Sequence, residues 1–237
     1  MISAVYDEHK GRYGYRRITL ELRKRGQWFN HKTIQRLMAQ LGLKSLVKSK
    51  RYRSYKGLVG KVAPNILQRE FESVEPNQKW VTDVTEFKVA GEKLYLSPIL
   101  DLYNGEIISY SIAKRPRFEM IKNMLDKAFK RLKRDEKPLL HSDQGWQYQM
   151  AYYQKILRDR QIVQSMSRKG NCYDNAAMEN FFGILKSECY YLQKFNSVDE
   201  LAKALDHYIH YYNHKRIKQK LKGLSPVQYR TQSLLAA

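Results

Sequence analysis

The sequence predicts an α/β fold, in which a mixed five-stranded sheet is flanked by helices and is preceded by a small helical domain. Two observations carry this prediction. Residues 15–41 show apolar side chains at helical spacing on both sides of a glycine-containing turn. From about residue 78 the pattern changes to short segments rich in Val, Ile, Thr and Phe, which later alternate with helical patterns.

The first predicted domain, residues 1–56, contains two short helices. The first spans about Tyr15–Lys24 and is ended by Gly26. The second is capped by Asn30 and stopped by Gly42. Its apolar side chains fall at i, i+3, i+4 and i+7, namely Ile34, Leu37, Met38 and Leu41. Two such helices around a turn predict a helix-turn-helix.

The opposite face of the second helix is basic and polar, which is typical of a surface that contacts DNA. It carries Lys32, Gln35 and Arg36, and the first helix adds Arg16 and Arg17. A basic tail with two tyrosines follows at 44–56. Two interpretations remain open: a DNA-binding surface, which the tail favours, and a solvated basic face on an ordinary helical hairpin.

A basic linker at 57–75, interrupted by glycine and proline, leads to the predicted core at 76–195. Three consecutive strands open the core, and Asn104-Gly105 forms the turn between the second and the third. The expected strands are 79–89, 94–103, 106–113, 139–142 and 162–166. The expected helices are 118–134, 150–160, 175–192 and, within a C-terminal helical extension at 196–237, 198–213. This order matches a ribonuclease H-like arrangement.

Composition points to a polyanionic partner. The chain has 237 residues and a net charge of +21, from 44 Lys and Arg against 23 Asp and Glu. Such a field attracts nucleic acid, and the size and the apolar content fit a ribosomal-type or membrane-surface protein less well. Cys172 and Cys189 are too few for a zinc site or a disulfide framework. Without a signal peptide or a long apolar run, we expect a soluble, cytoplasmic protein.

Three acidic residues are the candidate catalytic group: Asp83, Asp143 and Glu179. In the predicted topology the first strand and the fourth strand are neighbours, and the helix after the fifth strand can cross over them. The three carboxylates would therefore meet in one cleft. Hard ions such as Mg²⁺ prefer oxygen ligands, and two of them can drive an in-line displacement at phosphorus. We expect Asp83 to bridge both ions, Asp143 to bind one and Glu179 the other.

Neighbouring residues refine this site. Lys186 follows Glu179 by seven residues and would share its helix face, where it can hold a substrate phosphate. Glu188 is expected on another, solvated face, and Asp174 and Asn175 are expected to cap the helix. His141 has two open interpretations, a contact with substrate or metal and a packing role. Likewise, Arg168 and Lys169 either grip DNA or belong to a solvated loop. Glu86 is expected to be structural, and Asp101 to belong to the turn.

Five segments carry a resemblance to a known family. They are Arg12–Arg17 (RYGYRR), Trp80–Phe87 (WVTDVTEF), His141–Gly145 (HSDQG), Ser165–Glu188 (SMSRKGNCYDNAAMENFFGILKSE) and Leu224–Tyr229 (LSPVQY). They resemble the OrfB transposases of bacterial insertion sequences with two overlapping frames, which are similar to retroviral integrases and share their DDE core. The resemblance covers nearly the whole chain.

The resemblance implies cleavage and strand transfer of DNA at the ends of an insertion sequence. It implies Asp83, Asp143 and Glu179 as ligands of Mg²⁺, for which Mn²⁺ would substitute. It also implies that the upstream OrfA product acts as a fusion or partner. Because two DNA ends must be held together, we expect a homo-oligomer. Family members usually carry a few dozen more residues before Arg12–Arg17, which leaves two interpretations open: a truncated start, or one piece of a longer product.

Two alternatives stay open at this stage. One is a ribonuclease H-type nuclease, which the basic N-terminal helices and the Glu179 helix disfavour. The other is a DNA-binding regulator, or an inactive or partial transposase that acts only with an OrfA partner.

Overall fold

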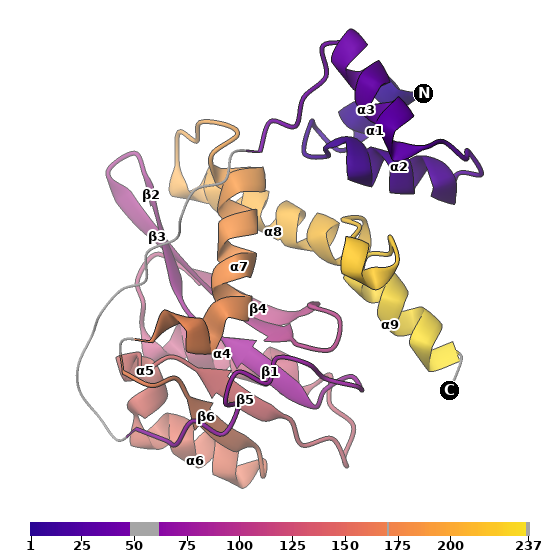
Figure 1. Ribbon diagram of the computed structural model, residues 1–237. Helices are drawn as coiled ribbons and strands as arrows, with labels where there is room; N and C mark the ends of the chain where they lie inside the picture. The colour runs from indigo at the N-terminus through magenta and orange to yellow at the C-terminus, as the bar shows by residue number, and fades with distance from the viewer. Residues whose placement is uncertain (48–61, 170, 236–237) are drawn as a thin grey trace. The chain divides into compact units, whose positions relative to one another are not determined.

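The computed structural model describes residues 1–47, 62–169 and 171–235, without the side chains of Cys172 and Leu234. The chain divides into two units (Figure 1). The helical unit comprises Met1–Lys50, Leu185–Lys194 and His207–Ala237, and the sheet unit comprises Arg51–Ile184 and Phe195–Asp206. The segment predicted as a C-terminal extension, 196–237, is thus divided between the two units. Residues 48–56 of the predicted basic tail and the start of the linker, residues 57–61, lie outside the described residues.

The sheet unit is built on a mixed sheet of six strands. They are β1 (Lys79–Thr82), β2 (Thr85–Val89), β3 (Glu92–Asp101), β4 (Ile107–Ala113), β5 (Leu139–Ser142) and β6 (Val163–Met166). The order across the sheet is β2-β3-β1-β5-β6, and β4 pairs with β3. β1 runs antiparallel to β3 and parallel to β5, and β5 runs parallel to β6. The predicted fold class is confirmed, with six strands instead of five.

The additional strand arises from a break in the predicted strand at 79–89. Thr82 lies opposite Ile99 of β3, and Thr85 lies opposite Leu96, so the pairing register is the same on both sides of the break. At the break, the Asp83 carboxylate accepts a hydrogen bond from the Val84 N–H at 2.7 Å. The side chain thereby takes a donor that an uninterrupted strand would give to the ladder.

Helices and the sheet enclose the main core of this unit. The helices are α4 (Phe118–Phe129), α5 (Trp146–Gln149), α6 (Ala151–Asp159) and α7 (Ala176–Leu185), with a 3-10 turn, η1 (Cys172–Asn175), before α7. α4 packs against β3 and β4, and α6 packs against β6. The core joins Trp80 and Leu140 of the central strands to Met124 and Leu125 of α4. Burial of such side chains stabilises the fold by roughly 1.5–3 kcal/mol each.

The helical unit begins with α1 (Ile2–Glu8), α2 (Tyr15–Lys24) and α3 (His31–Gln40). The two predicted helices are confirmed, whereas α1 was not predicted. Asn30 caps α3 by accepting a hydrogen bond from the Lys32 N–H at 2.9 Å. Gly26 and Gly42 follow α2 and α3 with φ of +79° and +67°, values that favour glycine. The core of the helical unit contains Val5, Tyr13, Ile18, Leu22, Ile34, Met38 and Ile217.

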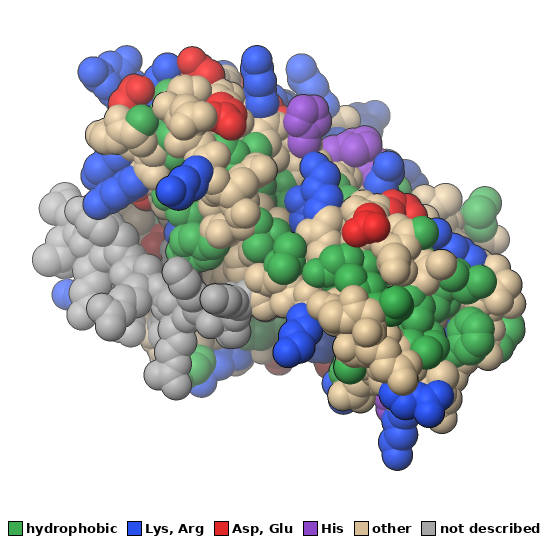
Figure 2. Space-filling model, turned by 90° about the horizontal axis from the view of Figure 1, so that it is seen from above, with side chains coloured by type: hydrophobic (Ala, Val, Ile, Leu, Met, Phe, Trp, Pro, Cys, Tyr) green, Lys and Arg blue, Asp and Glu red, His purple; other side chains and the backbone are tan. Residues whose placement is uncertain are grey.

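The C-terminal part of the chain adds further helices. A π-helix, η2 (Lys186–Tyr190), directly follows α7, where the sequence predicted one helix at 175–192. α8 (Val198–His214) confirms the last predicted helix, and η3 (Gln219–Leu221) and α9 (Pro226–Leu235) follow it. None of the helices in the described part of the chain is long and apolar enough to cross a membrane. Figure 2 shows Lys and Arg side chains spread over the face it presents, with Asp and Glu in a few places.

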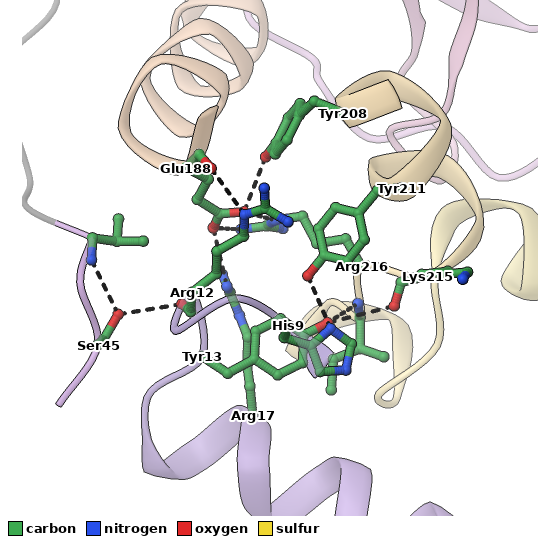
Figure 3. Close-up of polar contacts among 12 residues, drawn as sticks. His9, Arg12, Tyr13, Arg17, Ser45, Glu188, Tyr208, Tyr211, Lys215 and Arg216 are labelled. Atoms are coloured by element: carbon green, nitrogen blue, oxygen red, sulfur yellow. Dashed lines mark hydrogen bonds and ion pairs between the residues drawn. The ribbon is translucent and has the colours of Figure 1, made fainter. Parts of the chain in front are cut away.

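A buried ion cluster joins three separate segments of the helical unit (Figure 3). The side chains of Glu188 and Arg216 are each 2% exposed, and the Arg216 guanidinium donates to both Glu188 oxygens at 2.7 Å. Tyr208 Oη donates to the same carboxylate at 2.9 Å, and Arg17 Nη1 lies 3.1 Å from it. The sequence-based expectation that Glu188 is solvated is therefore wrong. The partners that bury it lie far away along the chain.

The electrostatics of this cluster define its role. Burial alone would raise the pKa of Glu188, but the hydrogen bonds and charge of Arg216, together with Arg17, hold that pKa below its usual range. The carboxylate therefore stays ionised and compensates Arg216. A buried ion pair of this kind is most sensitive to loss of one partner, because the other charge is then left in a medium of low polarity.

We predict that Glu188→Gln destabilises the helical unit by roughly 3 kcal/mol, because Arg216 loses its counter-charge. Since the folded pKa of Glu188 is depressed, its contribution is present above the unfolded pKa and is lost as pH falls through the folded pKa. The measurement is urea denaturation, with hydrogen exchange of residues 1–47, at neutral and acidic pH. Asp7→Asn, an exposed acid in α1, is the matched control. Equal effects of the two substitutions would contradict the prediction.

Candidate active site

Asp83 and Asp143 lie at the ends of two adjacent parallel strands. β1 and β5 pair Lys79 with Leu139 and Val81 with His141. Asp83 and Asp143 directly follow the last residues of these strands, Thr82 and Ser142. If the register is continued by two residues beyond Val81 and His141, Asp83 comes to lie opposite Asp143. The electrostatics of Tyr148 agree, because its pKa is raised first by complete burial and then by the negative charges of both aspartates. The parallel pairing therefore places the first two predicted acids side by side.

Local turns hold both aspartates in place. Asp83 is 8% exposed and accepts from the Val84 N–H, while Asp143 Oδ1 accepts from the Gly145 N–H at 2.8 Å. A Cβ at position 145 would lie 2.9 Å from Asp143 Oδ1, so glycine permits this close approach. Burial raises the pKa of Asp143 above its usual range. A carboxylate in this state gains from a cation nearby.

Glu179 comes from α7, whose start is attached to β1. The Asn175 side-chain amide donates to the Thr82 backbone carbonyl at 3.2 Å, directly before Asp83. Glu179 lies four residues after Asn175, about one helical turn further. It is partly buried, and this desolvation raises its pKa. The predicted apolar stripe of this helix is confirmed, because Met178, Phe181, Phe182 and Leu185 are buried.

Asp174 is the electrostatic centre of the loop that leads into α7. Its carboxylate is fully buried and receives both Arg168 Nε and Arg168 Nη2 at 2.9 Å, as well as the Arg168 backbone N–H at 2.9 Å. Arg69 Nε donates at 2.8 Å and Asn65 Nδ2 at 3.0 Å. The Arg168 interactions come first among the effects that hold the pKa of Asp174 well below its usual range. Asp174 therefore orders the loop before α7, a larger role than the predicted helix cap.

His141 follows the packing interpretation. It is fully buried, and its Nδ1 and Nε2 lie 2.8 and 3.0 Å from the hydroxyls of Ser165 and Ser167. Burial lowers its pKa to about 4, so the ring is neutral at physiological pH. Both ring nitrogens are engaged within the sheet unit, which supports the packing interpretation of His141. Glu86 is structural as predicted, since it pairs with Lys93 and Tyr95.

The predicted DNA-contacting residues are distributed over both units. In the helical unit Lys32, Gln35, Arg36 and Arg16 are exposed, whereas Arg17 pairs with Glu188. In the sheet unit Arg168 and Lys169 are exposed, and Arg168 is bound to Asp174. Lys186 is the first residue of the π-helix, so the α-helical spacing that predicted a face shared with Glu179 ends one residue before it. Its contact with phosphate stays a prediction.

The residues at this site fit hard divalent cations by the chemistry of their donors. Asp83 and Asp143 supply adjacent carboxylates, and among the described residues Asp143 and Glu179 form no ion pair that would satisfy their charge. Asn175 Oδ1 is also buried, and it has no hydrogen-bond partner among the described residues. The described residues contain no group of three or more His, Cys, Asp or Glu side chains already close enough to hold a metal ion. The strand register thus brings two of the three acids together.

Sequence reasoning missed several residues that shape the site. Tyr148 is close enough to both aspartates for their charges to raise its pKa. Asn175 attaches the start of α7 to β1, and Arg69 reaches Asp174 from a segment assigned to the linker. The position of Asn175, one turn before Glu179, was a usable signal. The contacts of Arg69 and Tyr148 carry no signature in the local sequence.

Comparison with known proteins defines the class. Residues 1–51 match an HTH-like domain, and residues 73–172 and 179–234 match two models of an integrase core domain. The integrase catalytic core of human T-cell leukaemia virus type 2 with magnesium, in its trimeric form, has a TM-score of 0.52 at 21% identity, covering 66% of this chain and 98% of that chain. A simian T-cell lymphotropic virus intasome has a TM-score of 0.58 at 17% identity, covering 97% and 74%. The fold is that of a DNA polynucleotidyl transferase with an integrase core.

Relatives narrow the class to one family. The putative transposase InsK for insertion sequence element IS150 of Escherichia coli K12 is 60% identical over 234 residues, covering 99% of this chain and 83% of that protein. The transposase InsF for insertion sequence IS3A of the same organism is 36% identical over 239 residues, covering 99% and 82%. The chain belongs to the OrfB-type transposases of the IS3 family.

We predict that Asp174→Asn loosens the start of α7, because two arginines lose their shared counter-charge. Since both arginines are about half exposed, the expected loss of stability is about 2 kcal/mol. Hydrogen exchange should accelerate in residues 171–180. Glu106→Gln is the matched control, because Glu106 is also a buried acid paired with a half-exposed arginine, Arg131 at 2.6 Å. If both substitutions accelerate exchange in 171–180 equally, the local role of Asp174 is refuted.

Proposed function

We propose that this transposase cleaves the DNA ends of its insertion sequence and joins them to target DNA, with Asp83, Asp143 and Glu179 as ligands of divalent metal ions. The observation that supports the proposal is the parallel β1–β5 register, which sets one buried and one partly buried carboxylate side by side just past the strand ends. α7 supplies the third carboxylate from a helix attached next to Asp83.

Asp83, at the break between two strands, would hold the divalent ions together with Asp143 and Glu179. When bound, two Mg²⁺ or Mn²⁺ ions would supply activation of the attacking oxygen and stabilisation of the leaving oxygen. Asp83 and Asp143 follow paired strands of the sheet, while Glu179 belongs to a helix whose preceding residue, Asn175, donates a hydrogen bond to the Thr82 carbonyl. Binding of cation and DNA would complete the set of ligands.

DNA binding is proposed to involve the helix-turn-helix region. The exposed face of α3 carries Lys32, Gln35 and Arg36, which have the side chains used for phosphate and base contacts. Arg16 lies exposed near the start of α2. The exposed side chains of Arg168 and Lys169 would contact DNA beside the catalytic acids, together with Lys186. Arg17 is the weakest of these candidates, since Glu188 already binds it.

Assembly is part of the proposal, because two DNA ends must be held at once. A homo-oligomer would provide two catalytic cores, and one of the similar integrase cores is described in a dimeric form. We further propose that the upstream OrfA product joins the complex as a fusion or partner. In a bacterial cell the protein would act in the cytoplasm on nucleoid DNA.

We predict that Asp143→Asn lowers cleavage and joining by roughly 10³-fold or more, because a metal ligand is lost. The assay is incubation with a fragment carrying both ends of the encoding insertion sequence, in Mg²⁺ or Mn²⁺. Mg²⁺ should also raise the melting temperature of the parent protein and not that of the variant. Asp135→Asn, an exposed acid of the sheet unit, is the matched control.

The same assay separates the alternatives. Activity retained by Asp143→Asn would remove the metal-ligand assignment. Cleavage without joining would favour a ribonuclease H-type nuclease, and binding without cleavage, even with OrfA present, would favour a DNA-binding regulator.

We predict different effects for two substitutions on α3. Gln35→Ala should weaken the free energy of binding to the ends of the insertion sequence by about 1–3 kcal/mol and relax the preference for their sequence, because a base contact is lost. Lys32→Ala should weaken binding to all DNA, because a phosphate contact is lost. It should also lower the slope of the logarithm of the binding constant against the logarithm of salt concentration by about one unit. Binding isotherms at several salt concentrations measure both, with Lys130→Ala at the end of α4 as the charge control. Identical profiles for the two α3 variants would argue against base readout by Gln35.

A further inference from the structure

An exposed cluster of two arginines and a tyrosine lies beside the start of α7 in the sheet unit. It consists of Arg69, Arg168 and Tyr173, and we name it the Arg–Tyr cluster. Arg69 and Arg168 side chains are 45% and 59% exposed, although both bind the fully buried Asp174. Two positive charges thus share one negative charge, and the cluster keeps a net positive charge at the surface.

Asp174 fixes the two guanidinium groups by only one edge each. Arg168 uses Nε and Nη2, and Arg69 uses Nε. Within the described residues, Arg168 Nη1 and both Nη atoms of Arg69 make no hydrogen bond. Donors that are already oriented lose little conformational entropy when they bind an anion, which favours phosphate at this surface.

Tyr173 provides an aromatic surface next to these donors. It is 69% exposed in the 3-10 turn η1, and the Arg69 guanidinium carbon lies 5.8 Å from its ring centroid. One exposed tyrosine alone is common in proteins. Here one side of the ring has a cation beside it, and the high exposure leaves ring surface for a further planar group.

The cluster is tied to the loop of the catalytic aspartate. Gln144, next to Asp143, donates from Nε2 to the Ser167 carbonyl at 3.0 Å. The segment that carries Arg69 runs beside β6, where the Met166 N–H donates to the Pro64 carbonyl at 3.2 Å. Tyr173 itself precedes Glu179 by six residues. A strand that contacts the cluster is therefore held close to the catalytic acids.

We propose that the Arg–Tyr cluster binds one nucleotide of an unpaired DNA strand, with its phosphate on Arg69 and Arg168 and its base stacked on Tyr173. This inference rests on the proposed function and deepens it, because it names unpaired strand ends as the substrate form. A base within a duplex has both faces covered by its neighbours and cannot stack on a protein ring. An unpaired base can, and such stacking tolerates any sequence.

The test measures binding of the full chain to two probes without metal. One probe is a short blunt duplex, and the other is the same duplex with a few mismatched terminal pairs that include 2-aminopurine. We expect Tyr173→Ala to weaken binding to the mismatched probe about tenfold and to leave the blunt probe nearly unchanged. Tyr173→Phe should bind like the parent protein and keep the change in 2-aminopurine fluorescence, since the ring is retained.

The controls separate this inference from structural damage. Tyr152→Ala removes another exposed tyrosine, on α6, and should bind both probes like the parent protein. Arg69→Ala should weaken binding to both probes and lower the salt dependence by about one unit of slope. An unchanged melting temperature of Tyr173→Ala would show that its fold is intact.

Two outcomes would overturn the inference. One is that Tyr173→Ala binds the mismatched probe as tightly as the parent protein, and the other is that it loses equal affinity for both probes. If the parent protein still cleaves insertion-sequence ends in either case, the proposed function survives and only the role of the cluster fails. If the parent protein binds neither probe and cleaves no ends, both fail together.

Discussion

The parallel pairing of β1 with β5 is the constraint on which the geometry of the proposed site depends. Successive side chains of a strand point to opposite faces, so a slip by one residue would turn Asp143 away from Asp83. The buried side chains of Trp80 and Leu140, which are partners in this register, oppose such a slip because it would expose them. The same strand register is therefore required both for packing of the core and for alignment of the two aspartates.

Four acids that are buried or partly buried fall into two electrostatic classes. Asp174 and Glu188 are compensated by arginines, which hold their pKa values low, and they organise the chain around them. Asp143 and Glu179 have pKa values raised by desolvation and form no ion pair among the described residues. The first class satisfies its charge within the fold. The second class leaves charge to be satisfied by something that binds, which is the behaviour expected of a functional site.

Sequence patterns predicted the features that depend on neighbouring residues, such as helix ends. They failed for features that depend on residues far away along the chain, such as the burial of Glu188. Asn30, Gly26 and Gly42 marked the ends of α2 and α3 because capping and positive φ are local properties. The neighbouring positions of Asp83 and Asp143 followed from the predicted pairing of the first strand with the fourth, and β1 does pair with β5. Glu188 could not be placed, because Arg216 and Tyr208 bury it from 28 and 20 residues away. In the same way, no local signal shows that Arg69 reaches Asp174, 105 residues later.

Asp83 lies at a break in an otherwise regular strand. Its carboxylate interrupts the strand by taking the Val84 N–H, yet β3 keeps the same pairing register on both sides. The strand is thus interrupted at one residue, while the sheet around it keeps its pairing. Such a local departure from regular structure is expected at functional sites, where function opposes stability. Desolvation of Asp143 opposite Asp83 adds to this cost. The cation proposed to bind both acids would remove part of this cost, and its binding would then stabilise the sheet unit.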